Sequence, residues 1–177
     1  MKNNFNISDF TNNKDLFYIL IAILLVDIIG IFLFRYFPKQ FGKSINEWYT
    51  VFGIFAVMSD ILVIFIGFMI ARYIYTIMNW NFNPILFIAT ILVVQIVHDM
   101  IFATLVIPSV PTGSNIMVDY FKQYIKSNGI AALIADSVMV IAIAIIAMIF
   151  KKYCSDSLMY FILAFVLYSM CFIIYKR

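Results

Sequence analysis

The chain has 177 residues, of which 65% are apolar, 18% aromatic and only 12% charged, and its mean hydropathy is +1.03. A soluble domain is about half apolar and about a quarter charged, so this composition excludes an ordinary soluble protein and indicates an integral membrane protein. The net charge of +3 is too small to suggest a nucleic-acid partner.

Five segments are long enough to cross a bilayer, which needs about 20 apolar residues each. Local signals delimit them: Pro38 ends the first, Ser44 and Glu47 form a capping box before the second, and Asn83 with Pro84 begins the third. We expect a polar N-terminal tail over residues 1–15, followed by spans over 16–37, 48–78, 84–107, 130–150 and 158–175.

Residues 116–127 carry apolar side chains at helical spacing, with polar side chains on the other face. This pattern predicts a short amphipathic helix that lies in the membrane interface or caps the bundle. Asn128 and Gly129 are expected to end it, because such residues commonly terminate helices. The fold class is therefore all-α, a single transmembrane domain over residues 16–177 with five spans and one interfacial helix.

The basic residues indicate how the chain is oriented. Five spans place the termini on opposite sides, and seven of the twelve lysines and arginines fall on the C-terminal side. Because cytoplasmic loops are richer in lysine and arginine, we expect the C-terminus in the cytosol and the N-terminus outside it.

Four aspartates lie within the predicted spans. They are Asp27, Asp60, Asp99 and Asp136, and Asp99 follows the only histidine, His98. A carboxylate in hydrocarbon costs about 2.5–3.5 kcal/mol on insertion scales, so such residues are functional candidates by default.

Helix periodicity brings several of these groups together. Gln95, His98 and Asp99 share one face of the third span, and Asp60 and Asp136 each lie on a stripe of glycine and alanine, which lets helices approach closely. We therefore expect one polar cluster that contains Asp60, Gln95, His98, Asp99 and Asp136, with Asp27 near its edge. Because no lysine or arginine lies at this depth, either several carboxyl groups are neutral or the cluster holds a cation or water.

Several chemistries lack their sequence signatures. No span has a central lysine for a retinal Schiff base, a single histidine excludes bis-histidine haem, and neither a Gly-x-Gly-Asp motif nor a glycine-rich phosphate loop occurs. A divalent metal held by His98 and aspartates is chemically possible, but no ligand-spacing motif supports it. We expect no cofactor.

The order of motifs from the third to the fourth span resembles a family of uncharacterised small polytopic membrane proteins of large DNA viruses. The resemblance rests on Asn83-Pro84-Ile85-Leu86-Phe87, Gln95-Ile96-Val97-His98-Asp99, Asp119-Tyr120-Phe121-Lys122, Asn128-Gly129 and Ala135-Asp136-Ser137, about half the chain. It implies a viral source and residence in a membrane. The family has no known activity, so it assigns no functional residues.

Three functions remain open. The first is a channel or transporter linked to protons or a small cation, in which His98 exchanges protons near neutral pH. The second is a non-catalytic component of a virion or organelle membrane, whose polar cluster only fixes helix packing. The third is an intramembrane enzyme with an Asp/His acid–base pair. The expected partners are the lipid bilayer and protons or a small cation, and assembly into a homo-oligomer stays open.

Overall fold

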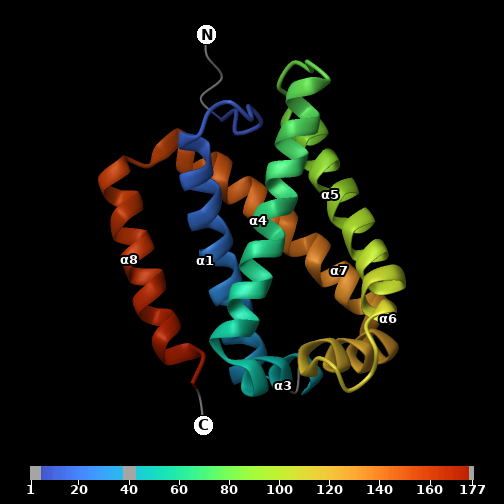
Figure 1. The fold of residues 1–177 in the computed structure, drawn as a ribbon. Helices are drawn as coiled ribbons and strands as arrows, with labels where there is room; N and C mark the ends of the chain where they lie inside the picture. Colours follow the sequence, from blue (N-terminus) through green and yellow to red (C-terminus); the bar gives the residue numbers. More distant parts are fainter. Residues whose placement is uncertain (1–4, 38–42, 176–177) are drawn as a thin grey trace.

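The computed structural model describes residues 5–37 and 43–175, with the backbone alone for residues 43–45. Every regular element in these ranges is helical (Figure 1). The elements are α1 (Lys14–Tyr36), α3 (Lys43–Phe52), α4 (Ile54–Ile77), α5 (Pro84–Ile101), the π-helical turn η1 (Phe102–Val106), α6 (Ile107–Ser109), α7 (Ile116–Tyr153) and α8 (Asp156–Ile173).

Within the described ranges, five helical stretches are long and apolar enough to cross a membrane. They are α1, α4, the stretch Pro84–Ser109, α7 and α8, and this confirms the expected number of apolar helices. The start of α1 and the end of α8 lie at opposite ends of the bundle (Figure 1).

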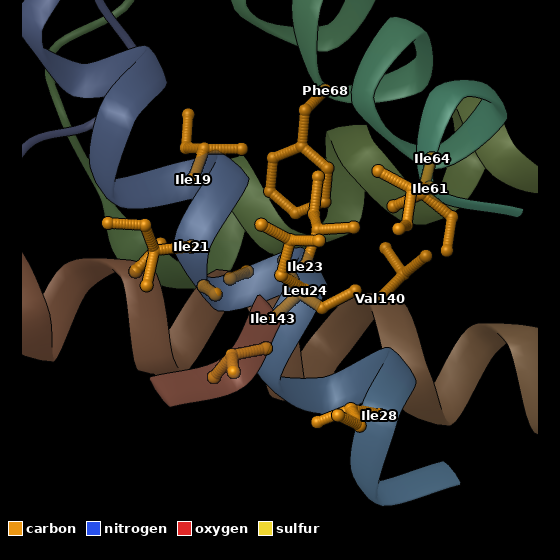
Figure 2. Close-up of a cluster of buried hydrophobic side chains, with 14 of the residues drawn as sticks. Ile19, Ile21, Ile23, Leu24, Ile28, Ile61, Ile64, Phe68, Val140 and Ile143 are labelled. Carbon is orange, nitrogen blue, oxygen red and sulfur yellow. The ribbon is translucent and has the colours of Figure 1, made fainter. Parts of the chain in front are cut away.

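Helix α1 forms the centre of the bundle. It contacts α4, α7 and α8, and its consecutive residues from Ile21 to Leu24 are all buried, as expected for a helix that is apolar all round. Figure 2 shows Ile23 and Leu24 of α1 among Phe68 of α4 and Val140 and Ile143 of α7, with Ile28 farther along α1. This apolar core holds together the helices that carry Asp27, Asp60 and Asp136.

The predicted second span, residues 48–78, is wrong as a single helix, because the chain breaks at Gly53. This glycine has φ +53° and ψ −125°, a conformation that side-chain-bearing residues rarely adopt. The break separates α4 from α3, whose Trp48 and Tyr49 are buried. Helix α3 is therefore a separate short helix, which the continuous apolar run in the sequence did not indicate. The loop at residues 39–43 lies largely outside the described residues, as does the Ser44 side chain of the capping box.

The predicted separation of an interfacial helix at 116–127 from a span at 130–150 is also wrong. Helix α7 runs without interruption for 38 residues, from an N-cap at Asn115 to Tyr153. Gly129 does not adopt the positive φ of a helix-ending glycine, since only Gly53 and Gly113 do so among the described glycines. The expected capping position is nonetheless partly right: the first turns of α7 lie across the lower end of the bundle beside α3, and the rest rises diagonally (Figure 1).

The third span continues slightly beyond its predicted end at Ile107. Pro108 has no N–H to donate to the preceding turn, and the helix widens before it into the π-turn η1 and ends at Ser109. Such π-turns often occur at functional sites. Here the turn begins at Phe102, four residues after His98.

The part of the N-terminal tail that the structure describes packs onto the bundle. Ile7 is fully buried, and the Arg72 guanidinium donates hydrogen bonds to the carbonyl oxygens of Asp9 and Asn12. Arg72 is itself fully buried, and it lies 3.9 Å from Asp15, whose other carboxylate oxygen is 2.7 Å from the Lys151 ammonium. These ion pairs link α1, α4 and α7 at the end of the bundle where α1 begins.

Candidate functional site

A cavity of about 280 Å³ lies between α1, α3, α4, α5 and α7. Its lining is of two kinds, acidic or polar side chains and aromatic rings, with a few aliphatic residues. The described residues that line it are Asp27, Phe34, Trp48, Tyr49, Ser59, Asp60, Val63, Ile64, Gln95, His98, Asp99, Phe102, Tyr120, Phe121, Tyr124, Ala135, Asp136 and Met139. Every residue of the predicted polar cluster is among them.

Asp60 is held in place by donors from α3 and α4. Its Oδ2 atom accepts hydrogen bonds from the Tyr49 hydroxyl at 2.9 Å and the Trp48 indole at 3.3 Å, and its Oδ1 atom accepts one from Ser59 at 3.4 Å. These contacts orient the carboxyl group at the cavity wall and hold the Trp48 and Tyr49 side chains beside it.

Asp99 is held by its own helix. The Gln95 amide donates to both carboxylate oxygens, at 2.9 and 3.0 Å, and His98 Nδ1 lies 3.1 Å from Oδ1. The i, i+4 spacing of Gln95 and Asp99 makes this contact possible. The His98 ring stacks on Phe102 of the π-turn, with centroids 5.8 Å apart, and 39% of its side chain is accessible.

Asp27 has a different environment. Its side chain is 1% exposed, and neither carboxyl oxygen has a hydrogen-bond partner among the described residues. A buried polar group without a partner costs about 1–3 kcal/mol, and more if it is charged. Asp27 is among the residues that line the cavity, together with the other members of the predicted cluster.

Small residues bring the helices close enough for the four aspartates to share one cavity. Ala56 and Ala71 of α4 and Ala144 and Ala147 of α7 are fully buried, as their predicted stripes require. A side chain at Gly67 would lie 3.8 Å from the Gln95 amide oxygen, so α4 and α5 are in close contact beside the cavity. Helices α1, α4, α5 and α7 each contribute one aspartate to the lining.

An aromatic layer lines the part of the cavity next to α3. The Trp48 ring lies 4.7 Å from Phe121 and 5.6 Å from Tyr120, and Phe121 lies 5.8 Å from Phe102, all between ring centroids. The sequence assigned Tyr120 and Phe121 to an interfacial helix face and did not connect Trp48 to the acids. Gly53 was the available signal, because a glycine inside a long apolar run can mark a helix break.

The lining has no lysine or arginine among the described residues, as expected for this depth. In that part of the chain no three His, Cys, Asp or Glu side chains are grouped closely enough to hold a metal ion. The carboxyl groups are instead distributed around the wall of a cavity. A water molecule takes up roughly 30 Å³, so the space suits several waters or a small organic molecule.

No protein-family model, curated protein or solved structure matches this chain. The resemblance to membrane proteins of large DNA viruses therefore stays a prediction about its source, and function has to be argued from the cavity.

Proposed function

We propose that the chain is a multi-pass membrane protein that takes up protons or a cation in the cavity between its helices and moves them across the membrane. Asp27 carries this proposal, because it lines the cavity and its buried carboxyl group has no hydrogen-bond partner among the described residues. A group with no structural contact to satisfy it contributes little to helix packing. Its burial is understandable if a proton or a cation occupies the site during function.

Charge and access support the same function. The lining contains four aspartates and no compensating lysine or arginine among the described residues. His98 and Asp99 also line the cavity, and 39% and 25% of their side chains are accessible. By the charge bias of its loops, the protein would have its C-terminus in the cytosol.

The experiment compares proton and cation flux into liposomes that contain the wild-type protein or the Asp27→Asn, Asp136→Asn or His98→Ala variant. The control is Asp156→Asn, which alters an exposed carboxyl group that accepts a hydrogen bond from Tyr18 away from the cavity. We expect wild-type flux above that of empty liposomes, an unchanged rate for the control and a loss of about tenfold or more for Asp27→Asn. Flux at the empty-liposome level in all proteins would overturn the proposal.

A second candidate is a structural membrane protein without transport. The observation in its favour is that Asp60 and Asp99 are held by donors of the protein itself, as packing contacts would be. On this alternative, the Asp60→Asn and Asp99→Asn variants would lose thermal stability, whereas Asp27→Leu would gain it because a buried polar group without a partner is removed. The same liposomes would show no flux.

A further inference from the structure

The cavity combines one carboxyl group that lacks a partner with a wall of aromatic rings. Asp27 supplies the carboxyl group, and Trp48, Tyr120 and Phe121 supply the rings. The centroids of Phe121 and Tyr120 lie 4.7 and 5.6 Å from that of Trp48. Aromatic rings attract cations within about 6 Å of their centroid, and they do so best for weakly hydrated organic cations. Neither a proton nor a hydrated inorganic ion needs such a wall.

The size of the cavity argues in the same direction. Ligand pockets for drug-sized molecules are about 300–1,000 Å³, and this cavity of about 280 Å³ lies just below that range. A bare metal ion would need several ligand atoms at about 2.0–2.6 Å. The described His, Cys, Asp and Glu side chains form no group of three that could hold one.

The aromatic wall is also fixed in position. The Trp48 indole donates to Asp60, and the neighbouring Tyr49 hydroxyl donates to the same oxygen, so α3 presents its rings to the cavity in one orientation. A preformed wall of this kind loses little conformational entropy when a ligand binds.

From these contacts we infer that the cavity binds a small organic cation, an ammonium group with apolar substituents. Asp27 is its counter-charge, and the rings of Trp48, Tyr120 and Phe121 contact its apolar part. The inference rests on the proposed uptake of a cation and names the class of that cation.

The test uses Trp48 as a reporter. The chain has two tryptophans, and Trp80 contacts Tyr75 and does not line the cavity. The Trp80→Phe protein therefore keeps one tryptophan, in the cavity wall. Its fluorescence is measured in detergent during titration with benzyltrimethylammonium, which carries a permanent charge. Parallel titrations use sodium chloride at equal ionic strength and neutral benzyl alcohol. Asp27→Asn and Asp156→Asn are each added to the Trp80→Phe background, and size-exclusion profiles check that they are folded.

We expect a saturable change with benzyltrimethylammonium, an unchanged affinity in Asp156→Asn, and an affinity at least about tenfold weaker in Asp27→Asn. Equal affinity in Asp27→Asn, or an equal response to benzyl alcohol, would overturn the inference. If Asp27→Asn does not fold, the test is a competition experiment with choline, a second quaternary ammonium. Choline should displace benzyltrimethylammonium from the Trp80→Phe protein, and failure to displace it would overturn the inference.

The two proposals fail in different ways. Asp27-dependent flux of protons or inorganic cations without any saturable binding of benzyltrimethylammonium would overturn the organic cation and leave the proposed function standing. Asp27-dependent binding without flux of any ion in liposomes would support the ligand class and overturn transport.

Discussion

The hydroxyl group of Tyr49 donates a hydrogen bond of 2.9 Å to Oδ2 of Asp60, although the helix break at Gly53 separates the two residues. In an unbroken helix, residues eleven apart would lie about 16 Å apart along the axis. The turn at Gly53 folds α3 back toward α4 and thereby brings aromatic side chains to an acidic one. Because of this contact, the cavity is lined by aromatic side chains of α3 as well as by the aspartates.

The Tyr49→Phe variant should lose the contact and keep the ring. We expect the free energy of unfolding to fall by about 0.5–1.5 kcal/mol, the net value of a typical hydrogen bond, because Trp48 and Ser59 still donate to Asp60. Thermal unfolding in detergent measures this change in stability. Tyr168→Phe is the matched control, since Tyr168 is 66% exposed. An equal change in the two variants would contradict the assigned contact.

Two glycines should respond in opposite ways to alanine. Gly53 has a positive φ, so Gly53→Ala should cost about 1–3 kcal/mol in backbone strain. Gly129 lies inside α7, and a methyl group there would make only an ordinary contact with Ile125 at 3.9 Å. Gly129→Ala should therefore raise stability by about 0.5–1 kcal/mol. Thermal unfolding of both variants checks this, and a stabilising Gly53→Ala would contradict the break.

Asp15 should be the aspartate whose loss is most costly outside the cavity. Asp15→Asn leaves the Lys151 ammonium and the fully buried Arg72 guanidinium without their carboxylate. Removing one partner of a buried ion pair costs about 3–5 kcal/mol, and we expect the lower end because Arg72 keeps two carbonyl partners. Chemical unfolding in detergent is the measurement. Asp156→Asn, at an exposed position, should change stability by less than about 0.5 kcal/mol.

The N-terminal segment should respond to acid through Asp9. The Thr11 hydroxyl donates to the Asp9 carboxylate at 2.7 Å, and this hydrogen bond holds the pKa of Asp9 below its ordinary value of 3.8. A group with a lowered folded-state pKa stabilises the fold above its ordinary pKa, and this contribution is lost as the pH falls through the folded-state value. Thr11→Val should therefore lose less stability than wild type between about pH 5 and about pH 3. Melting temperatures at both pH values test this, and identical slopes would contradict it.

Relationships within one helix could be predicted from the sequence. Gln95, His98 and Asp99 share a face because of helix periodicity, and their side chains contact one another as that spacing allows. The alanines of the predicted stripes are buried on α4 and on the second half of α7, whereas Gly129 of the α7 stripe is exposed. Asp15, Arg72 and Lys151 are separated by long stretches of sequence and lie near the ends of different helices, so no periodicity indicated that they meet.

Five apolar helices and most of their ends could be predicted from the sequence, because apolar length and helix periodicity are local properties. The break at Gly53 and the continuous helix at Gly129 depend on how the whole bundle packs. The same packing brings Asp27 and Trp48 into the lining of one cavity. A glycine tolerates both a helical and a positive φ, so the packing around it selects between them. How helices rotate against one another in lipid depends on close packing rather than on a hydrophobic gradient, and this packing is a property of the whole bundle.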